Sequence, residues 1–277
     1  MEAIKSILVH MDSLPRSRVR LQLAHDLAEQ HGAEVTALYA AMSGDLMYPL
    51  GASVGYPWEP IVSEFNDERR ALARACYDGA VASGLRRLQW AELTQRESTY
   101  GFGQRALYSD LVVMGQYEPG ASTAQDVMPD FVESVLIESG RPVLIVPYAC
   151  EAPSLPATVL VAWKPTREAA RAVSDALPLL RSARQVHVAT WSDDPFSPTA
   201  PQDIEAQLRR HGVDPTMHGG GKAPEEMGES LLSLATDVGA DLLVMGCYGH
   251  SRTREWVLGG ATRTALQSMT IPVLMTH

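Results

Sequence analysis

The sequence contains few of the residues that mark several common classes of protein. Its 277 residues include three cysteines, Cys76, Cys150 and Cys247, which are odd in number and far apart. This arrangement suggests neither a disulfide framework nor paired metal ligands. Basic residues number 23 against 33 acidic ones, giving a formal net charge of −10. The shortage of Lys and Arg argues against a general nucleic-acid partner, because binding to nucleic acid relies on clustered basic residues.

Long apolar runs are also missing. No stretch approaches the ~20 residues that span a bilayer. The first twelve residues, MEAIKSILVHMD, carry charges inside a short apolar run and no cleavage-site pattern, unlike a signal peptide. We therefore expect no membrane association and a reducing, cytoplasmic location. The hydrophobic fraction of 45% and the charged fraction of 20% are typical of a soluble globular protein.

The main positive feature is internal repetition. SILVHMD (6–12) recurs as TVLVAWK (158–164), SDLVVMGQY (109–117) as ADLLVMGCY (240–248), and RPVLIVPY (141–148) as IPVLMTH (271–277). Three apolar runs in the same order indicate two copies of one domain. Two prolines within YACEAPSLPA mark a linker between the copies. The predicted domains are residues 1–150 and 151–277.

Each copy has the pattern of alternating strands and helices. The apolar runs are short and continuous, which suits parallel strands buried on both faces. In the second copy, Thr166 is a candidate N-cap before an apolar helical stripe, formed by Ala169, Ala172, Val173, Ala176, Leu177 and Leu180. A helix with Val19, Leu23 and Leu27 takes the same place in the first copy. We predict an α/β fold of two tandem, doubly wound domains, each a parallel sheet sandwiched by helices.

A glycine-containing loop follows the apolar run 242–245. Gly246 and Gly249 precede nine residues, then Gly259 and Gly260 stand before an expected helix. Unpaired N–H groups and the helix dipole attract anions at such a point, and glycine lets the backbone approach a phosphate closely. Thr262 adds a hydroxyl, but no Gly-Lys-Ser/Thr of a Walker A loop follows. On spacing alone, a phosphate site and a tight strand-to-helix turn both remain open.

The pattern Gly-x2-Gly-x9-Gly, after an apolar strand and before PVL, resembles the nucleotide-binding signature of the universal stress protein family. With the repeat, the chain resembles a tandem member of that family. The resemblance implies a parallel five-stranded α/β sandwich of the adenine-nucleotide alpha hydrolase-like type, and frequent dimerisation. ATP-binding members usually carry Ser or Thr at the position of Gly260. They also use an acidic residue after the first strand to contact the nucleoside; the first copy has Asp12 there and the second has Lys164.

The corresponding loop of the first copy departs from the pattern. Gly115 matches Gly246, but Glu118 stands in place of the second glycine, and Pro129 and Asp130 replace the last two. Proline has no N–H to donate. A carboxylate 4 Å from a phosphate charge is repelled by on the order of 1–4 kcal/mol. We expect the first copy to have lost phosphate binding, with Asp130 capping the helix that follows.

These observations predict a stress-response protein that binds ATP or a related nucleotide in the second domain only. It would act by binding and would not be an enzyme, because no catalytic triad or metal set is visible. The predicted binding residues are Trp163, Lys164, Met245, Gly246, Gly249, Gly259, Gly260, Ala261 and Thr262. The alternative is a scaffold or protein-interaction module of the same fold without nucleotide. An unidentified protein partner and a homodimer both stay open.

Three further segments carry weaker expectations. Cys247 lies in the glycine loop and is either a reactive thiol near a helix N-terminus or an ordinary small residue. The segment HGGGKAPEE (218–226) is interpreted as a surface connection. Residues 42–62 contain three prolines and three glycines, which argue against regular structure. Their aromatic residues suggest that they cover a sheet edge or a partner surface.

Overall fold

The computed structural model describes residues 3–40, 59–93, 98–118, 127–152, 154–191, 201–219, 224–247 and 260–277. These residues form two compact units. One is built from Ile4–Arg141 and the other from Pro142–Cys150 and Ser154–His277. Strand β5 (Val143–Val146), from the first sequence copy, is thereby grouped with the C-terminal unit. The domain boundary after residue 150 follows the sequence repeat and stays a prediction.

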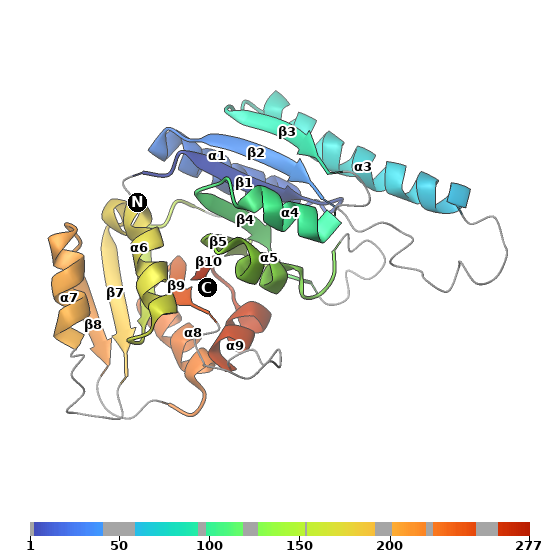
Figure 1. The fold of residues 1–277 in the computed structure, drawn as a ribbon. Coiled ribbons are helices and arrows are strands. Elements are labelled where there is room, and N and C mark those ends of the chain that lie inside the picture. Colours follow the sequence, from blue (N-terminus) through green and yellow to red (C-terminus); the bar gives the residue numbers. More distant parts are fainter. Residues whose placement is uncertain are drawn as a thin grey trace. The chain divides into compact units, whose positions relative to one another are not determined.

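The N-terminal unit is a parallel sheet with helices on its faces (Figure 1). Its strands lie in the order β3-β2-β1-β4. They are β1 (Ser6–Met11), β2 (Glu34–Tyr39), β3 (Leu88–Glu92) and β4 (Leu111–Gly115). The helices are α1 (Ser17–His31), α3 (Glu59–Ala82), α4 (Ser98–Ala106) and α5 (Phe131–Ser139). Helix α1 packs against α3, and α4 packs against α5.

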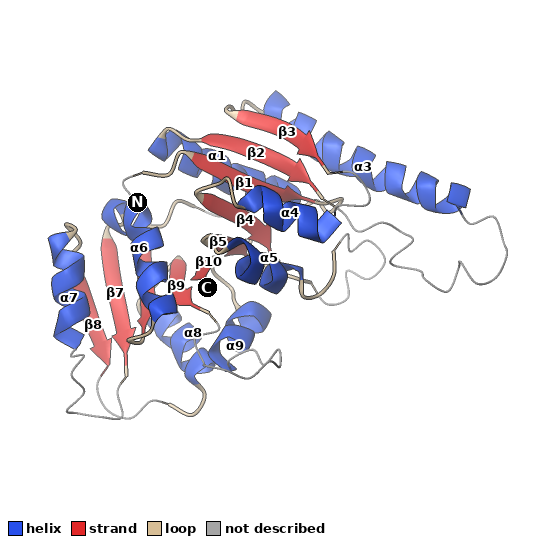
Figure 2. Cartoon of the chain, viewed as in Figure 1, coloured by secondary structure: helices blue, strands red, loops and turns tan. Residues whose placement is uncertain are grey.

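The C-terminal unit repeats this plan (Figure 2). Its strands are β5, β6 (Thr158–Trp163), β7 (Gln185–Thr190), β8 (Pro215–Gly219), β9 (Leu242–Gly246) and β10 (Val273–Thr276), in the order β5-β10-β9-β6-β7-β8. The helices are α6 (Arg167–Ser182), α7 (Pro201–Arg210), α8 (Met227–Asp237) and α9 (Gly260–Ser268). Strands β6 to β10 form a five-stranded parallel sheet, so the α/β prediction is confirmed. Strand β5 adds to it in antiparallel orientation, with Val273 opposite Ile145.

The apolar runs of the sequence become the central strands. The central residues of β1, β4, β6 and β9 are buried, because helices cover both faces of a parallel sheet. The apolar stripe of α6 is buried along its whole length. Thr166 caps that helix as predicted, accepting a hydrogen bond from the N–H of Ala169 at 3.3 Å.

Two local predictions were wrong. Asp130 stands at the N-cap of α5, but its side chain makes no capping hydrogen bond. Glu59–Val62, expected to be irregular, begin helix α3; Pro60 is tolerated there because the first helical N–H groups have no partner inside the helix. The rest of the 42–62 segment, up to residue 58, lies outside the described residues, as do Gly220, Gly221 and Lys222 of the 218–226 segment.

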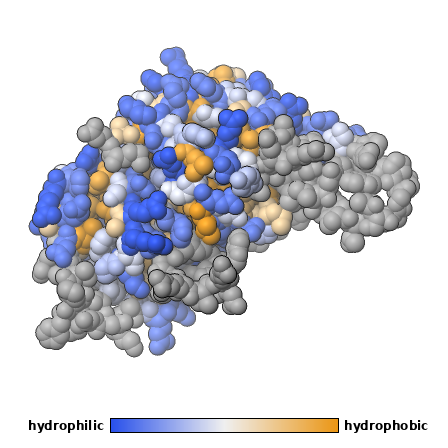
Figure 3. Space-filling view, viewed as in Figure 1, coloured by the Kyte–Doolittle hydropathy of each residue, from blue (hydrophilic) through white to orange (hydrophobic). Residues whose placement is uncertain are grey.

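The view in Figure 3 shows a mainly hydrophilic described surface with small apolar patches between polar residues. The larger exposed apolar side chains in the described ranges are Leu72, Val81, Tyr100, Tyr108, Met128 and Ile137, all from the N-terminal unit. Within the described residues, no helix has both the length and the apolar character needed to cross a bilayer.

Candidate functional site

Four of the predicted nucleotide residues lie where β6 and β9 end side by side. These strands are paired in parallel from Val159 opposite Leu242 to Ala162 opposite Met245. From β6 the chain runs outward to β7 and β8, whereas β9 leads to β10 on the other side. The order of the strands therefore reverses between β6 and β9, and ligands of open α/β sheets bind at such a point, beyond the carboxyl ends of the strands.

The structure brings four predicted residues to this edge: Trp163 and Lys164 at the end of β6, and Met245 and Gly246 at the end of β9. Trp163 is half-buried and Lys164 is exposed. The Met245 side chain is buried in the core, so only its backbone is available at the edge.

The other predicted residues belong to the segment that ends in helix α9. Gly260, Ala261 and Thr262 form its first turn. Their N–H groups are among those that an α-helix leaves without an internal partner. The Thr262 side chain is buried. Gly249 and Gly259 lie outside the described residues.

Close packing against helix α6 explains why residue 246 is a glycine. A Cβ at this position would stand 2.5 Å from the backbone N of Ala169 and 2.5 Å from the carbonyl carbon of Glu168. The first turn of α6 therefore rests on the end of β9, and only glycine permits that approach. A ligand is not required to explain this residue.

Packing does not account for Gly260. It is exposed, it is helical, and a Cβ there would meet no atom of the described residues within 4 Å. A close approach of some other molecule to the first turn of α9 would give this glycine a role.

The first turn of α6 contains an acidic side chain of its own. Glu168 is buried, and its carboxylate accepts a hydrogen bond from Nε of Arg167. Burial alone would raise the pKa of Glu168, but the hydrogen bonds from Arg167 and Thr166 hold it below the usual value. An ionised acid in this position complements the positive end of the helix dipole.

Cys247 follows β9 and is fully buried. Its N–H donates to the carbonyl of Thr276 at 3.0 Å. Burial, reinforced by the Glu168 carboxylate, raises the pKa of the Cys247 thiol. Because the thiolate is the reactive form, the structure favours the reading of Cys247 as an ordinary small residue.

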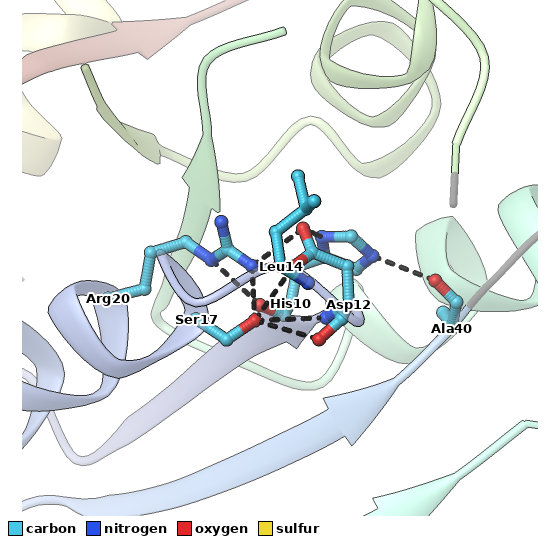
Figure 4. A network of polar contacts seen from close by, with 6 residues as sticks. All are labelled: His10, Asp12, Leu14, Ser17, Arg20 and Ala40. Atoms are coloured by element: carbon cyan, nitrogen blue, oxygen red, sulfur yellow. Dashed lines mark hydrogen bonds and ion pairs between the residues drawn. The ribbon is translucent and has the colours of Figure 1, made fainter. Parts of the chain in front are cut away.

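In the first copy, a network of polar side chains fills the equivalent edge (Figure 4). The Asp12 carboxylate lies 2.7 Å from Nη2 of Arg20 and accepts hydrogen bonds from the Ser17 hydroxyl at 2.8 Å and the Leu14 N–H at 3.0 Å. Nε of Arg20 donates to the carbonyl of His10 at 3.0 Å. Burial would raise the pKa of Asp12, but the Arg20 guanidinium beside it holds that pKa below its usual value.

His10 lies between this network and the apolar core. Its ring packs edge-on against Phe102 and Phe131, at 5.3 and 4.8 Å between centroids. Burial, opposed by the Asp12 carboxylate, lowers the pKa of His10 to about 4. The neutral ring lies with Nε2 2.8 Å from the carbonyl of Ala40, so Nε2 carries the proton that it donates.

The two copies can be compared position by position, because their strands pair in the same register. The network residues His10, Asp12, Ser17 and Arg20 correspond to Ala162, Lys164, Ala169 and Ala172. Arg20 also reaches Gly115, where a Cβ would lie 2.5 Å from Nη1. The first copy thus fills its edge with its own ion pair, whereas the second has three alanines and an exposed lysine there.

The sequence analysis did not identify His10, Ser17 or Arg20. One signal was available for Arg20. It lies on the helical stripe that continues to Leu23, Ala24 and Leu27, all buried. A charged residue on the buried stripe of a helix needs an opposite charge nearby. Asp12, directly after the first apolar run, could supply it.

Comparison with known proteins agrees with this architecture. Residues 205–277 match the sequence profile of the universal stress protein family. The matched segment includes β8, α8, β9, α9 and β10 and therefore most of the predicted nucleotide residues. Among curated proteins, no relative matches the sequence.

Solved structures extend the likeness to both copies. A universal stress protein from Archaeoglobus fulgidus DSM 4304 has a TM-score of 0.71 at 18% identity, with 98% of this chain and 95% of that chain covered. A protein assigned to the same family from Pseudomonas aeruginosa UCBPP-PA14 has a TM-score of 0.59 at 15% identity, with 99% and 94% covered. At these identities the likeness concerns the fold. The profile match in the second copy and the fold of the whole chain agree with the prediction of a tandem universal stress protein.

Proposed function

We propose that the second copy binds ATP or a related nucleotide through its phosphates, and that the protein acts in stress adaptation by binding rather than by catalysis. The observation that carries the proposal is Gly260, an exposed glycine in the first turn of α9 that no packing contact with the described residues requires. A helix N-terminus with an accessible backbone is suited to an anion. The match of residues 205–277 to the universal stress protein profile supports the same proposal.

Lys164 gives the site a second anion-attracting group. It is exposed at the end of β6, one strand away from the end of β9. In the described part of the chain it forms no ion pair. As an ammonium group it cannot accept hydrogen bonds from ribose hydroxyls, but it attracts phosphate. We therefore place Lys164 beside the phosphate chain of the nucleotide.

Gly260→Asp provides a sharp test. Since a side chain at this position meets open space, the substitution leaves folding intact and places a carboxylate at the first turn of α9. ATP binding to the wild type by titration calorimetry, and its loss in Gly260→Asp, would support the proposal. Gly260→Ser is the matched control, because it adds a side chain of similar length without charge and supplies a hydroxyl. ATP binding that is equal in wild type and Gly260→Asp would contradict the proposal.

The alternative is a protein-interaction module with no nucleotide. Two exposed tyrosines of the N-terminal unit favour it: Tyr100 is 67% exposed and Tyr108 is 83% exposed. Exposed aromatic residues are common at binding surfaces. Native mass spectrometry of the purified protein separates the two proposals, because only the first predicts a mass increase on addition of ATP.

A further inference from the structure

Two histidines that are far apart in the sequence meet on the outer strands of the C-terminal unit. Nδ1 of His187, on β7, lies 2.8 Å from Nε2 of His218, on β8. Their ring centroids are 4.9 Å apart and the rings are tilted by 46°. His218 is opposite Ala189, two residues beyond His187, so both rings project from the same face of the sheet. The 31-residue separation matches no metal motif, so sequence patterns did not indicate this pair.

The backbone holds the two rings in place. Strands β7 and β8 pair from Val186 opposite Pro215 to Thr190 opposite Gly219. Gly219 has φ +133°, and a Cβ there would lie 1.7 Å from the carbonyl oxygen of Thr190. Only glycine allows β8 to end so close to β7. His218 is the residue before Gly219. The contact at Gly219 and the pairing of β8 with β7 together fix the position of His218 relative to β7.

The facing nitrogens are bonded to each other, whereas the other ring nitrogen of His187 has no such partner. Nε2 of His187 is buried and has no hydrogen-bond partner within the described residues. Both residues are half-exposed, so the pair lies at the surface of the unit. Burial and the neighbouring His218 ring lower the pKa of His187. The neutral imidazole is the form that binds metals.

We propose that His187 and His218 form a binding site for a divalent transition-metal ion, Cu²⁺ or Ni²⁺ in preference to Zn²⁺. Metal–imidazole bonds are about 2.0–2.1 Å long. Two such bonds from nitrogens 2.8 Å apart enclose an angle of about 90°, the cis angle of tetragonal Cu²⁺ and Ni²⁺. A tetrahedral Zn²⁺ site would require the nitrogens to be roughly 3.3 Å apart. Water completes the coordination of the ion.

Metal binding leaves the number of protons on the two histidine rings unchanged. In the free protein one proton lies between the two nitrogens. When the ion binds, each ring is coordinated by the facing nitrogen and keeps one proton on its other nitrogen. His187 then carries its proton on Nε2 and His218 on Nδ1. No net proton is released, and two metal–nitrogen bonds replace one hydrogen bond.

The test is calorimetric titration of the full-length protein with CuSO₄, NiCl₂ and ZnCl₂ at pH 7.5. The half-exposed cysteines Cys76 and Cys150 are replaced by serine in all samples, because thiolates also bind these ions. We expect one site with affinity in the order Cu²⁺, Ni²⁺, Zn²⁺. His187→Gln and His218→Gln should each weaken Cu²⁺ binding by at least tenfold. His211→Gln, in a half-exposed histidine of the same unit that bonds to Arg181 and Gln207, should leave it unchanged.

Absence of binding, or equal affinity in the wild type and both variants, would overturn the proposal. Tighter binding of Zn²⁺ than of the other two ions would overturn the geometric assignment. Histidine ¹⁵N spectra of the wild type provide a readout that does not depend on how well the variants fold. Substoichiometric Cu²⁺ should broaden the signals of two histidine rings before the others, and uniform broadening of all eight histidines would also contradict the site.

Discussion

The guanidinium of Arg20 and the carboxylate of Asp12 form a buried ion pair with 2.7 Å between Nη2 and Oδ2. The two side chains are 3% and 7% exposed. Removing one partner of a buried pair leaves an uncompensated charge, which costs about 3–5 kcal/mol. We predict that Asp12→Asn lowers the free energy of unfolding by this amount in urea titration. The double variant Asp12→Leu/Arg20→Met should recover part of the loss, because no buried charge then remains.

The control for this experiment is an exposed pair of the same unit. Arg74 and Asp78 form an i,i+4 ion pair at 2.9 Å, with side chains that are 50% and 56% exposed. Such pairs contribute about 0.3–0.5 kcal/mol. Asp78→Asn should therefore change the unfolding free energy by less than about 1 kcal/mol. Comparable losses in Asp12→Asn and Asp78→Asn would show that the buried network is not the stabilising element.

His10 should make the stability of the N-terminal unit depend on pH. Its pKa is about 4 in the folded protein against 6.5 as the ordinary value. The unfolded chain therefore binds a proton more readily, so stability is full above pH 6.5 and is lost as pH falls from 6.5 to 4. This shift in pKa corresponds to a change of about 3 kcal/mol in the free energy of unfolding. Unfolding free energies measured between pH 7.5 and 4.5 should fall less steeply in His10→Gln; identical slopes would contradict the assignment.

The features that the sequence predicted correctly are those that depend on local patterns of residues. The strands, the repeat, the cap at Thr166 and the stripe of α6 all follow from residue type and spacing. The antiparallel pairing of β5 with β10 does not, because each strand shows the same apolar pattern in either orientation. The pairs Asp12–Arg20 and His187–His218 depend on side-chain placement across elements. Only the buried charge of Arg20 on an apolar stripe signalled one of them.

Both copies share a structural aspartate that the sequence motifs had not singled out. The Asp110 carboxylate accepts hydrogen bonds from the N–H groups of Lys5 and Ser6, and the Asp241 carboxylate from those of Ala157 and Thr158, at 2.8 to 3.0 Å. Each aspartate thus ties the start of the central strand to the start of its neighbour. Hydrogen bonds to charged groups are worth about 1.5–3 kcal/mol.

We therefore expect Asp110→Ala and Asp241→Ala each to lower the unfolding free energy by about 2 kcal/mol. Asp214→Ala is the matched control in the C-terminal unit, because that side chain is 86% exposed and pairs with the exposed Arg209. Chemical denaturation followed by tryptophan fluorescence measures all three. A loss in Asp214→Ala as large as in Asp241→Ala would argue against the backbone contacts as the cause.

Cysteine accessibility offers a check on the edge of β9. Cys247 is fully buried with a raised pKa, whereas Cys76 and Cys150 are half-exposed. Alkylation requires an accessible thiolate. Iodoacetamide at pH 8 should modify Cys247 more slowly than the other two, and peptide mass spectrometry gives the order. Early modification of Cys247 in the folded protein would contradict its placement.

Lys164 provides the last prediction, on the proposed nucleotide site. It stands where the first copy has Asp12, exposed at the end of β6. Replacing a cation near a phosphate by an anion changes attraction into repulsion, and each unit-charge contact at 4 Å is worth on the order of 1–4 kcal/mol. Lys164→Asp should therefore weaken ATP binding by at least about tenfold, and Lys164→Met by less. Titration calorimetry at 50 and 200 mM salt measures both, and the difference between the variants should shrink at the higher salt.

Arg184→Asp is the control for this charge change. Arg184 is an exposed residue directly before β7, at the opposite edge of the same sheet. It alters the net charge of the C-terminal unit by the same amount, so a general electrostatic effect would weaken ATP binding equally in both variants. Local contact with the phosphates predicts loss in Lys164→Asp alone. Tighter ATP binding in Lys164→Asp would instead indicate that the nucleoside, rather than the phosphate chain, lies beside the end of β6.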